Sequence, residues 1–273
     1  MSLPISTNPL TLLPNSPDAW AAAVAAALDA AGAVIRPHFR VGLAADDKAD
    51  ESPVTVADRA AEETLRALLQ AAFPEYGIIG EEFPPHNTGA RYVWVIDPID
   101  GTRAFITGRT TFCTLLGLLE DGVPVFGAID QPVTRERWMG GRDFPTRFTG
   151  PLGGVAGTRQ GVTLEQAELS STSPEMLGDG AARFARLQAQ AKRMYWGGDA
   201  YAYGLLALGQ IDVVAECCLK PWDWAALAPV IEAAGGVVTD WAGERLRLGA
   251  DGSVLASANA GLHAQALGAL KAA

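Results

Sequence analysis

Two aspartates three residues apart follow a hydrophobic strand in the first half of the chain. The run Trp94–Ile96 leads into Asp97 and Asp100, and Gly101 and Thr102 come next, where a helix is expected to begin. Carboxylates at this spacing at the end of a strand can converge on hard divalent cations, which prefer oxygen ligands. Backbone amides at a helix N-terminus suit a phosphate oxygen. The segment therefore predicts adjacent metal and phosphate sites, and a turn with capping aspartates is the alternative.

Two further segments supply carboxylates that could join the same ions. Glu81 and Glu82 follow a short predicted strand over Gly77–Gly80. An isolated pair of glutamates is more often part of a solvated surface. Pro221 sets the first turn of a later helix, which places Asp223 near the positive end of that helix. Taken alone, Asp223 is better explained as a helix cap.

Together these segments resemble the inositol monophosphatase superfamily of magnesium-dependent, lithium-sensitive sugar and polyol phosphatases. The family motifs GEE, DPIDGT and WD occur here in the right order and spacing, and the resemblance covers nearly the whole chain from about residue 20. It implies two or three Mg²⁺ ions in the active site. The ligands that it implies are Glu81, Asp97, the carbonyl of Ile99, Asp100 and Asp223.

The same resemblance assigns further roles. Thr102 corresponds to the threonine that, with Glu81, orients and deprotonates the attacking water, and Gly101 and Thr102 are expected to bind the phosphate. Asp58 corresponds to a catalytic acid on a helix near the outer metal, and Lys48 to a lysine of a mobile loop that closes over the site. Such metals would generate a hydroxide, hold the leaving oxygen and neutralise the phosphoryl group. The expected reaction is hydrolysis of a phosphomonoester by metal-activated water.

The expected substrate is L-histidinol phosphate, because several segments look closest to the monophosphatase-like histidinol-phosphate phosphatases. These segments are 105–108, 130–138, 198–203 and 216–227. Histidinol carries an ammonium group and an imidazole, so Asp199 and Glu216 are candidate substrate-binding carboxylates. Asp199 is equally well explained as a helix N-cap, and Glu216 matches an acid of the broader family and does not discriminate.

Other functions remain open at this point. An inositol-1-phosphate phosphatase or a broad-specificity sugar and polyol phosphatase is the alternative within the same reaction class. A bisphosphate substrate is disfavoured, because Lys220 is the only basic residue between Gly198 and Trp222. A catalytically silent regulatory binding protein is the alternative from another class, and it would be expected to lack a ligand or Thr102.

The composition of the chain limits the kinds of partner and the cellular location that are expected. The 273 residues carry a formal net charge of −10, which disfavours nucleic acid and anionic membranes as partners. The most apolar segment, 19–35, is interrupted by Asp29 and has no basic residue before it, so neither a signal peptide nor a membrane anchor is expected. Three cysteines, two of them adjacent, do not suit a disulfide framework. These features predict a cytoplasmic protein, and the resemblance implies a homodimer.

The pattern of elements predicts a layered fold. Ser16 and Pro17 begin a helix that runs to about His38, and a capping box at 55–58 begins a second helix that ends at Ala72. Several strands follow, and strands and helices then alternate. The glycine-rich and proline-rich segment 142–161 is either a surface excursion or a seam between halves. We expect an α+β half over 1–145, an α/β half over 146–273, and together an αβαβα sandwich resembling inositol monophosphatase and fructose-1,6-bisphosphatase.

Overall fold

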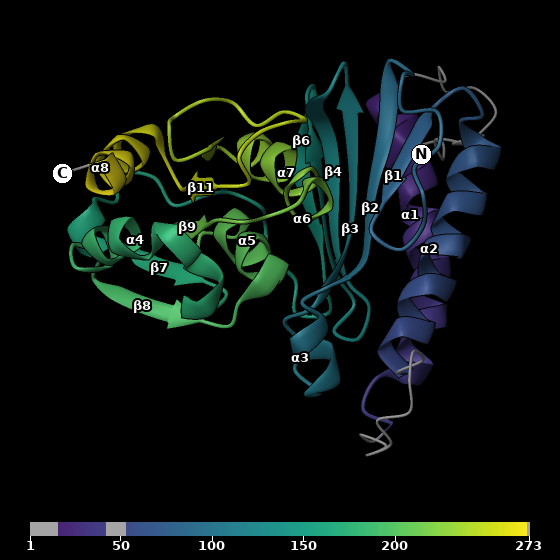
Figure 1. Cartoon of the computed structure of the whole chain (residues 1–273), viewed down its shortest axis with the longest axis horizontal. Helices are drawn as coiled ribbons and strands as arrows, with labels where there is room; N and C mark the ends of the chain where they lie inside the picture. The colour runs from purple at the N-terminus through teal and green to yellow at the C-terminus, as the bar shows by residue number, and fades with distance from the viewer. Residues whose placement is uncertain (1–15, 42–52, 272–273) are drawn as a thin grey trace, which may run out of the picture.

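The computed structural model describes residues 16–41 and 53–271, and Lys48 lies outside these ranges. The chain forms two sheets and three layers of helices, which alternate as predicted (Figure 1). The elements of the first half are α1 (Pro17–Ile35), η2 (Arg36–His38), α2 (Pro53–Ala72), β1 (Gly77–Gly80), β2 (Tyr92–Asp100), α3 (Thr102–Ile106), β3 (Cys113–Glu120), β4 (Val123–Gln131), β5 (Glu136–Gly141) and β6 (Phe144–Thr149).

The second half adds a smaller sheet with its own helices. Its elements are η3 (Leu164–Gln166), β7 (Glu168–Ser171), η4 (Pro174–Gly180), α4 (Ala181–Gln188), β8 (Arg193–Trp196), α5 (Asp199–Ala207), β9 (Val213–Glu216), α6 (Pro221–Trp224), α7 (Leu227–Ala233), β10 (Val237–Thr239), β11 (Val254–Ser257) and α8 (Ala260–Lys271). The six strands of the first sheet lie in sequence order, and the second sheet has the order β10-β11-β9-β7-β8.

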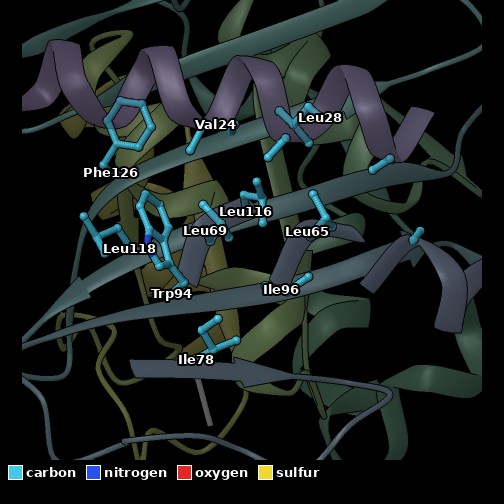
Figure 2. Close-up of a cluster of buried hydrophobic side chains, with 14 of the residues drawn as sticks. Val24, Leu28, Leu65, Leu69, Ile78, Trp94, Ile96, Leu116, Leu118 and Phe126 are labelled. Carbon is cyan, nitrogen blue, oxygen red and sulfur yellow. The ribbon is translucent and has the colours of Figure 1, made fainter. Parts of the chain in front are cut away.

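The outer layer of the first half is the helix pair α1 and α2. Ser16 accepts the amide of Ala19 at the start of α1, as the sequence predicts. One stripe of α1, which includes Val24 and Leu28, is buried against α2 and the first sheet, where it meets Leu116 and Phe126 (Figure 2). Together with η2, α1 is long and apolar enough to cross a membrane, but this stripe lies in the protein core.

The middle layer of helices joins the two sheets. It contains α5, α6 and α7, and it shares one hydrophobic cluster with the inner faces of both sheets. At its centre the backbone of Ala225 and Ala226 lies directly on β3 and β4. A Cβ on Gly117 would lie 2.7 Å from the carbonyl carbon of Ala225, and one on Gly127 would lie 2.1 Å from the carbonyl oxygen of Ala226. Only glycine allows this approach, which places α6 against the first sheet.

Three local predictions are wrong. Helix α2 begins at Pro53, so the capping box predicted at 55–58 does not mark its start. The predicted helix over 221–234 is divided into α6 and α7. The glycine-rich segment after residue 142 is partly regular, because β6 pairs with β5 and extends the first sheet to Thr149. Glycine and proline signal turns but do not exclude an edge strand between them.

Candidate active site

A bulge in β2 brings its two aspartates to the same place. Asp97 pairs with Leu115 of β3 and Asp100 pairs with Cys113, so β2 advances three residues while β3 advances two. In a regular strand, residues three apart point to opposite faces. The extra residue in the bulge lets Asp97 and Asp100 point to the same face. Within the bulge the carbonyl of Pro98 accepts the hydroxyl of Thr114 at 2.7 Å. The local backbone therefore turns two carboxylates toward the same site.

Asp223 joins these aspartates from the second half of the chain. Carboxylate oxygens of Asp97, Asp100 and Asp223 lie within 4.8 Å of one another. Pro221 begins α6, and Asp223 accepts the amide of Lys220 at 2.7 Å through Oδ2. The carboxylate of Asp223 therefore caps the helix and also belongs to the acidic cluster. Residues from both halves of the chain meet at the candidate site.

The electrostatics of this cluster fit a hard divalent cation. Asp97 is 2% exposed, and its Oδ1 is buried without a hydrogen-bond partner. Burial raises the pKa of Asp97 well above its usual range, and repulsion from Asp100 and Glu81 raises it further. Burial also raises the pKa of Asp100, with repulsion from Asp223 adding to it. Desolvated, mutually repelling carboxylates with an unpaired oxygen are a donor set that a bound cation would satisfy.

Two further acids lie beside the cluster. Burial raises the pKa of Glu81 to about 7, with repulsion from Asp223 and Glu82 adding to it, while a side-chain hydrogen bond with Asp97 lowers it. Asp58, on α2, is buried, whereas Glu81 is exposed, and burial with repulsion from Glu82 raises the pKa of Asp58 to about 8. The structure therefore brings Glu81 and Asp58 together next to Asp97.

A buried glutamate that sequence reasoning missed holds the backbone of this loop. Glu62 of α2 is fully buried, and its Oε2 accepts the amide of Glu82 at 2.8 Å. Its Oε1 pairs with Nε of Arg66 at 2.7 Å, and Arg66 also donates to the carbonyl of Phe83. A Cβ on Gly80 would lie 2.0 Å from Glu62 Oε1, so a side chain there would displace this carboxylate. The spacing of Glu62 four residues after Asp58 was the available signal, because it places both on one helix face.

Gly101 and Thr102 lie where β2 turns into α3. Gly101 has a φ of +81°, and a Cβ there would lie 3.0 Å from the Cβ of Asp199, so glycine is required. The hydroxyl of Thr102 donates to the carbonyl of Ile99 at 3.4 Å, which places this threonine beside a predicted ligand atom. Oδ2 of Asp100 accepts the amide of Ala200 at 2.7 Å. The cluster is thus linked directly to the first turn of α5.

A cavity of about 290 Å³ opens next to the cluster. Its wall includes the predicted residues Asp100, Gly101, Thr102, Asp199, Glu216 and Asp223. Arg103 is the only basic residue among the described residues that line this cavity. The wall also includes the apolar side chains of Met176, Leu219 and Leu227. Residues predicted to bind the phosphate, the metal and the substrate therefore line one pocket.

Asp199 does not cap α5. Its φ is +43°, a strained backbone conformation for a non-glycine residue, and Oδ2 accepts the hydroxyl of Thr111 at 3.1 Å. Burial raises its pKa, while Thr111 and Arg109 lower it. Both oxygens of Glu216 have donors, because Oε1 accepts the amide of Thr172 and Oε2 the hydroxyl of Tyr203. The two carboxylates are held in fixed positions on the pocket wall.

Comparison with known proteins identifies the family. The model of the inositol monophosphatase family matches residues 17–273. The bifunctional phosphatase IMPL2 of Arabidopsis thaliana is 42% identical over 97% of this chain and 78% of its own length. A histidinol-phosphatase of Mycobacterium tuberculosis is 35% identical over 89% of this chain and 95% of its own. The structure of an inositol monophosphatase from Zymomonas mobilis, 44% identical, superposes with a TM-score of 0.87 over 94% of this chain and all of that one. The chain therefore belongs to the inositol monophosphatase family and is a phosphatase of phosphoric monoesters.

Proposed function

We propose that this phosphatase hydrolyses L-histidinol phosphate with Mg²⁺ as its metal. The observation that carries the proposal is the carboxylate of Asp199, which is desolvated on the pocket wall and faces a cavity that also contains Glu216. An ammonium group or a protonated imidazole would pair with such a carboxylate. The similarity to histidinol-phosphatases supports the same substrate.

The apolar part of the pocket favours the same choice. Met176, Leu219 and Leu227 offer no hydrogen-bonding side chains to a polyhydroxylated ring, whereas the carbon skeleton of histidinol can pack against them. A second phosphate would lie among carboxylates with only Arg103 to balance it. Both features disfavour a sugar bisphosphate.

The residues of the chain would have different roles in the reaction. The metal ions would be held by the carboxylates of Asp97, Asp100, Asp223 and Glu81 and by the carbonyl of Ile99. When bound, Mg²⁺ would supply an activated water and charge neutralisation at the phosphoryl group.

The other residues would orient the reactants. Thr102, next to Ile99, and Glu81 would orient the attacking water and accept its proton. The backbone at Gly101 would contact the phosphate, and the neighbouring Asp199 would bind the positively charged leaving group, so that phosphate and alcohol are held side by side in one cavity.

Inositol 1-phosphate is the second candidate. It is favoured by the family itself and by the close superposition on the Zymomonas mobilis inositol monophosphatase. Glu216 is compatible with either substrate, because a carboxylate can accept hydroxyl groups as well as an ammonium group.

The test compares kcat/KM for L-histidinol phosphate and inositol 1-phosphate with Mg²⁺, using the wild-type chain, Asp199→Asn and the control Asp179→Asn. Asp179 is exposed on η4 and does not line the cavity, so its variant makes the same change of charge outside the pocket. We expect kcat/KM of the wild-type chain to be roughly a hundredfold higher for histidinol phosphate than for inositol 1-phosphate. In Asp199→Asn, but not in the control, this ratio should fall about tenfold, which is the effect of losing one charge-assisted contact. Equal rates on both esters would instead assign a broad-specificity phosphatase.

A further inference from the structure

Cys217 and Cys218 place two thiols side by side next to the substrate pocket. They follow β9 directly, and a side-chain hydrogen bond joins them. Cys217 is buried and Cys218 is exposed, so the pair lies at the surface and can be reached from solvent. The φ of Cys218 is +66°, a conformation that favours glycine, yet a cysteine occupies it.

Both sulfur atoms lie against the same short segment, the C-terminal part of η4. A Cβ on Gly178 would lie 3.7 Å from Sγ of Cys218, and one on Gly180 would lie 3.1 Å from Sγ of Cys217. The thiol of Cys217 donates to the carbonyl of Leu177 at 3.0 Å. The two thiols contact the same segment and are hydrogen-bonded to each other. They therefore point to the same side of the chain and can bind one ligand together.

The spacing of the pair favours a ligand that bridges the two sulfurs. Adjacent Cα atoms are about 3.8 Å apart, which is shorter than the range of about 4.4–6.8 Å across ordinary disulfides. A direct sulfur–sulfur bond would therefore be strained. Zinc takes about four ligands in structural sites, and the pair supplies two. A single soft atom that forms bonds to two sulfurs fits better.

The protonation of Cys217 bears on the choice among such atoms. Burial raises the pKa of the Cys217 thiol to about 12, with Cys218 adding to it, so Cys217 carries its proton at neutral pH. The ligand must therefore displace the Cys217 proton itself. Trivalent arsenic bound to oxygen meets this requirement, because its oxygen leaves as water.

We propose that Cys217 and Cys218 form a bidentate binding site for trivalent arsenicals, and that its occupation distorts the substrate pocket. With phenylarsine oxide the arsenic–oxygen bond is replaced by two arsenic–sulfur bonds. The two thiol protons and the oxygen leave as one water molecule. Arsenic stays trivalent, and no oxidant or reductant is required.

The link to the pocket is short. Glu216 precedes the pair and Leu219 follows it, and both line the cavity. Met176, one residue before the carbonyl that holds Cys217, lines it as well. Bridging the sulfurs removes the hydrogen bond to Leu177 and moves both flanking residues. A misplacement of about 1 Å near a substrate can reduce turnover roughly a hundredfold.

The experiment treats the full chain with phenylarsine oxide and measures the bound mass and the hydrolysis of an artificial phosphomonoester with Mg²⁺. We expect one arsenical for each chain and a loss of activity of roughly tenfold or more. A dithiol should restore activity, whereas a monothiol should not, because only a dithiol replaces both arsenic–sulfur bonds in one chelate. The matched variant is Cys218→Gly, which removes one thiol and suits the backbone at φ +66°. It should keep the basal activity and resist the arsenical.

Each of the other possible outcomes contradicts one part of the proposal. Reversal by a monothiol, or equal labelling of Cys218→Gly, would exclude a bidentate site and leave Cys113 or a single thiol as the target. Stoichiometric labelling at Cys217 and Cys218 with full activity would exclude the link to the pocket. The mass readout needs no substrate, so it does not depend on whether histidinol phosphate is the natural one.

Discussion

Two buried carboxylates, one in β2 and one just before β9, have opposite surroundings. Asp97 has an unpaired oxygen and faces other acids. Asp212, just before β9, is fully buried as well, but its oxygens accept bonds from the guanidinium of Arg159 and from the amide of Glu168. A buried charge that is paired stabilises a local structure, and a buried charge that is left facing like charges needs an external partner. The comparison separates the acids that bind a ligand from those that hold the fold.

The largest effect is expected for Asp97→Asn. Removing a metal ligand should reduce kcat on the order of 10³-fold. The same change removes a repelling charge, so the metal-free variant should unfold at a higher temperature than the metal-free wild-type chain. Steady-state kinetics and thermal unfolding in a chelator measure both. A variant that loses activity and also loses metal-free stability would contradict the unpaired state of Asp97.

Asp212→Asn should show the reverse pattern. The variant leaves Arg159 without its charged partner, and because that side chain is 45% exposed we expect a loss of only about 2 kcal/mol in the free energy of unfolding. The activity of the folded fraction should stay unchanged, since Asp212 does not line the cavity. Urea unfolding and a rate per folded molecule test this. A change in the Mg²⁺ dependence would show that the two sets of acids are coupled.

Glu62→Gln tests a residue that shares features of both kinds of acid, those of the cluster and those that hold the fold. It is paired with Arg66, but its other oxygen fixes the amide of Glu82 next to Glu81. We expect the Mg²⁺ concentration for half-maximal activity to rise about tenfold, because residues that support metal ligands have effects of this size. KM should change little at saturating Mg²⁺. Glu63→Gln, on the exposed face of the same helix, is the control. An equal rise of this Mg²⁺ concentration in both variants would show that the effect comes from the helix in general and not from the contact of Glu62 with Glu82.

The smallest effect concerns His263, a buried group that is satisfied without any charge. Its ring nitrogens lie 3.1 Å from the hydroxyl of Ser257 and 3.0 Å from that of Thr239, and burial lowers its pKa to about 4. Between the unfolded pKa of 6.5 and this value, the unfolded chain binds a proton that the folded chain excludes, so stability falls as the pH falls.

From about pH 7.5 to 5.5 the loss should be about 1 kcal/mol. Urea unfolding of metal-free protein at both pH values measures it, and His263→Gln should lack this part of the pH dependence. The acids of the cluster change the stability in the opposite direction, because their folded pKa values are raised. Only the difference between the two proteins is therefore informative. An identical pH dependence in both would exclude the histidine as its source.

Much of the fold and of the metal cluster follows from local sequence. Hydrophobic periodicity and turn residues predict the layers, and the spacing of Asp97 and Asp100 predicts their convergence. What sequence reasoning missed depends on contacts between distant segments. Asp199, whose φ is positive, packs directly against Gly101, a residue about a hundred positions away, and the role of Glu62 depends on the position of Glu82. No local pattern encodes such contacts.

The close contact of Gly117 and Gly127 with Ala225 and Ala226 also fixes the geometry of the acidic cluster. Asp223 and Asp97 come from different halves of the chain, and one backbone rests directly on another between these halves. A side chain added at either glycine would have to separate the two backbones, and Asp223 would then move away from Asp97 and Asp100. The spacing of the three carboxylates therefore depends on two residues that carry no side chain.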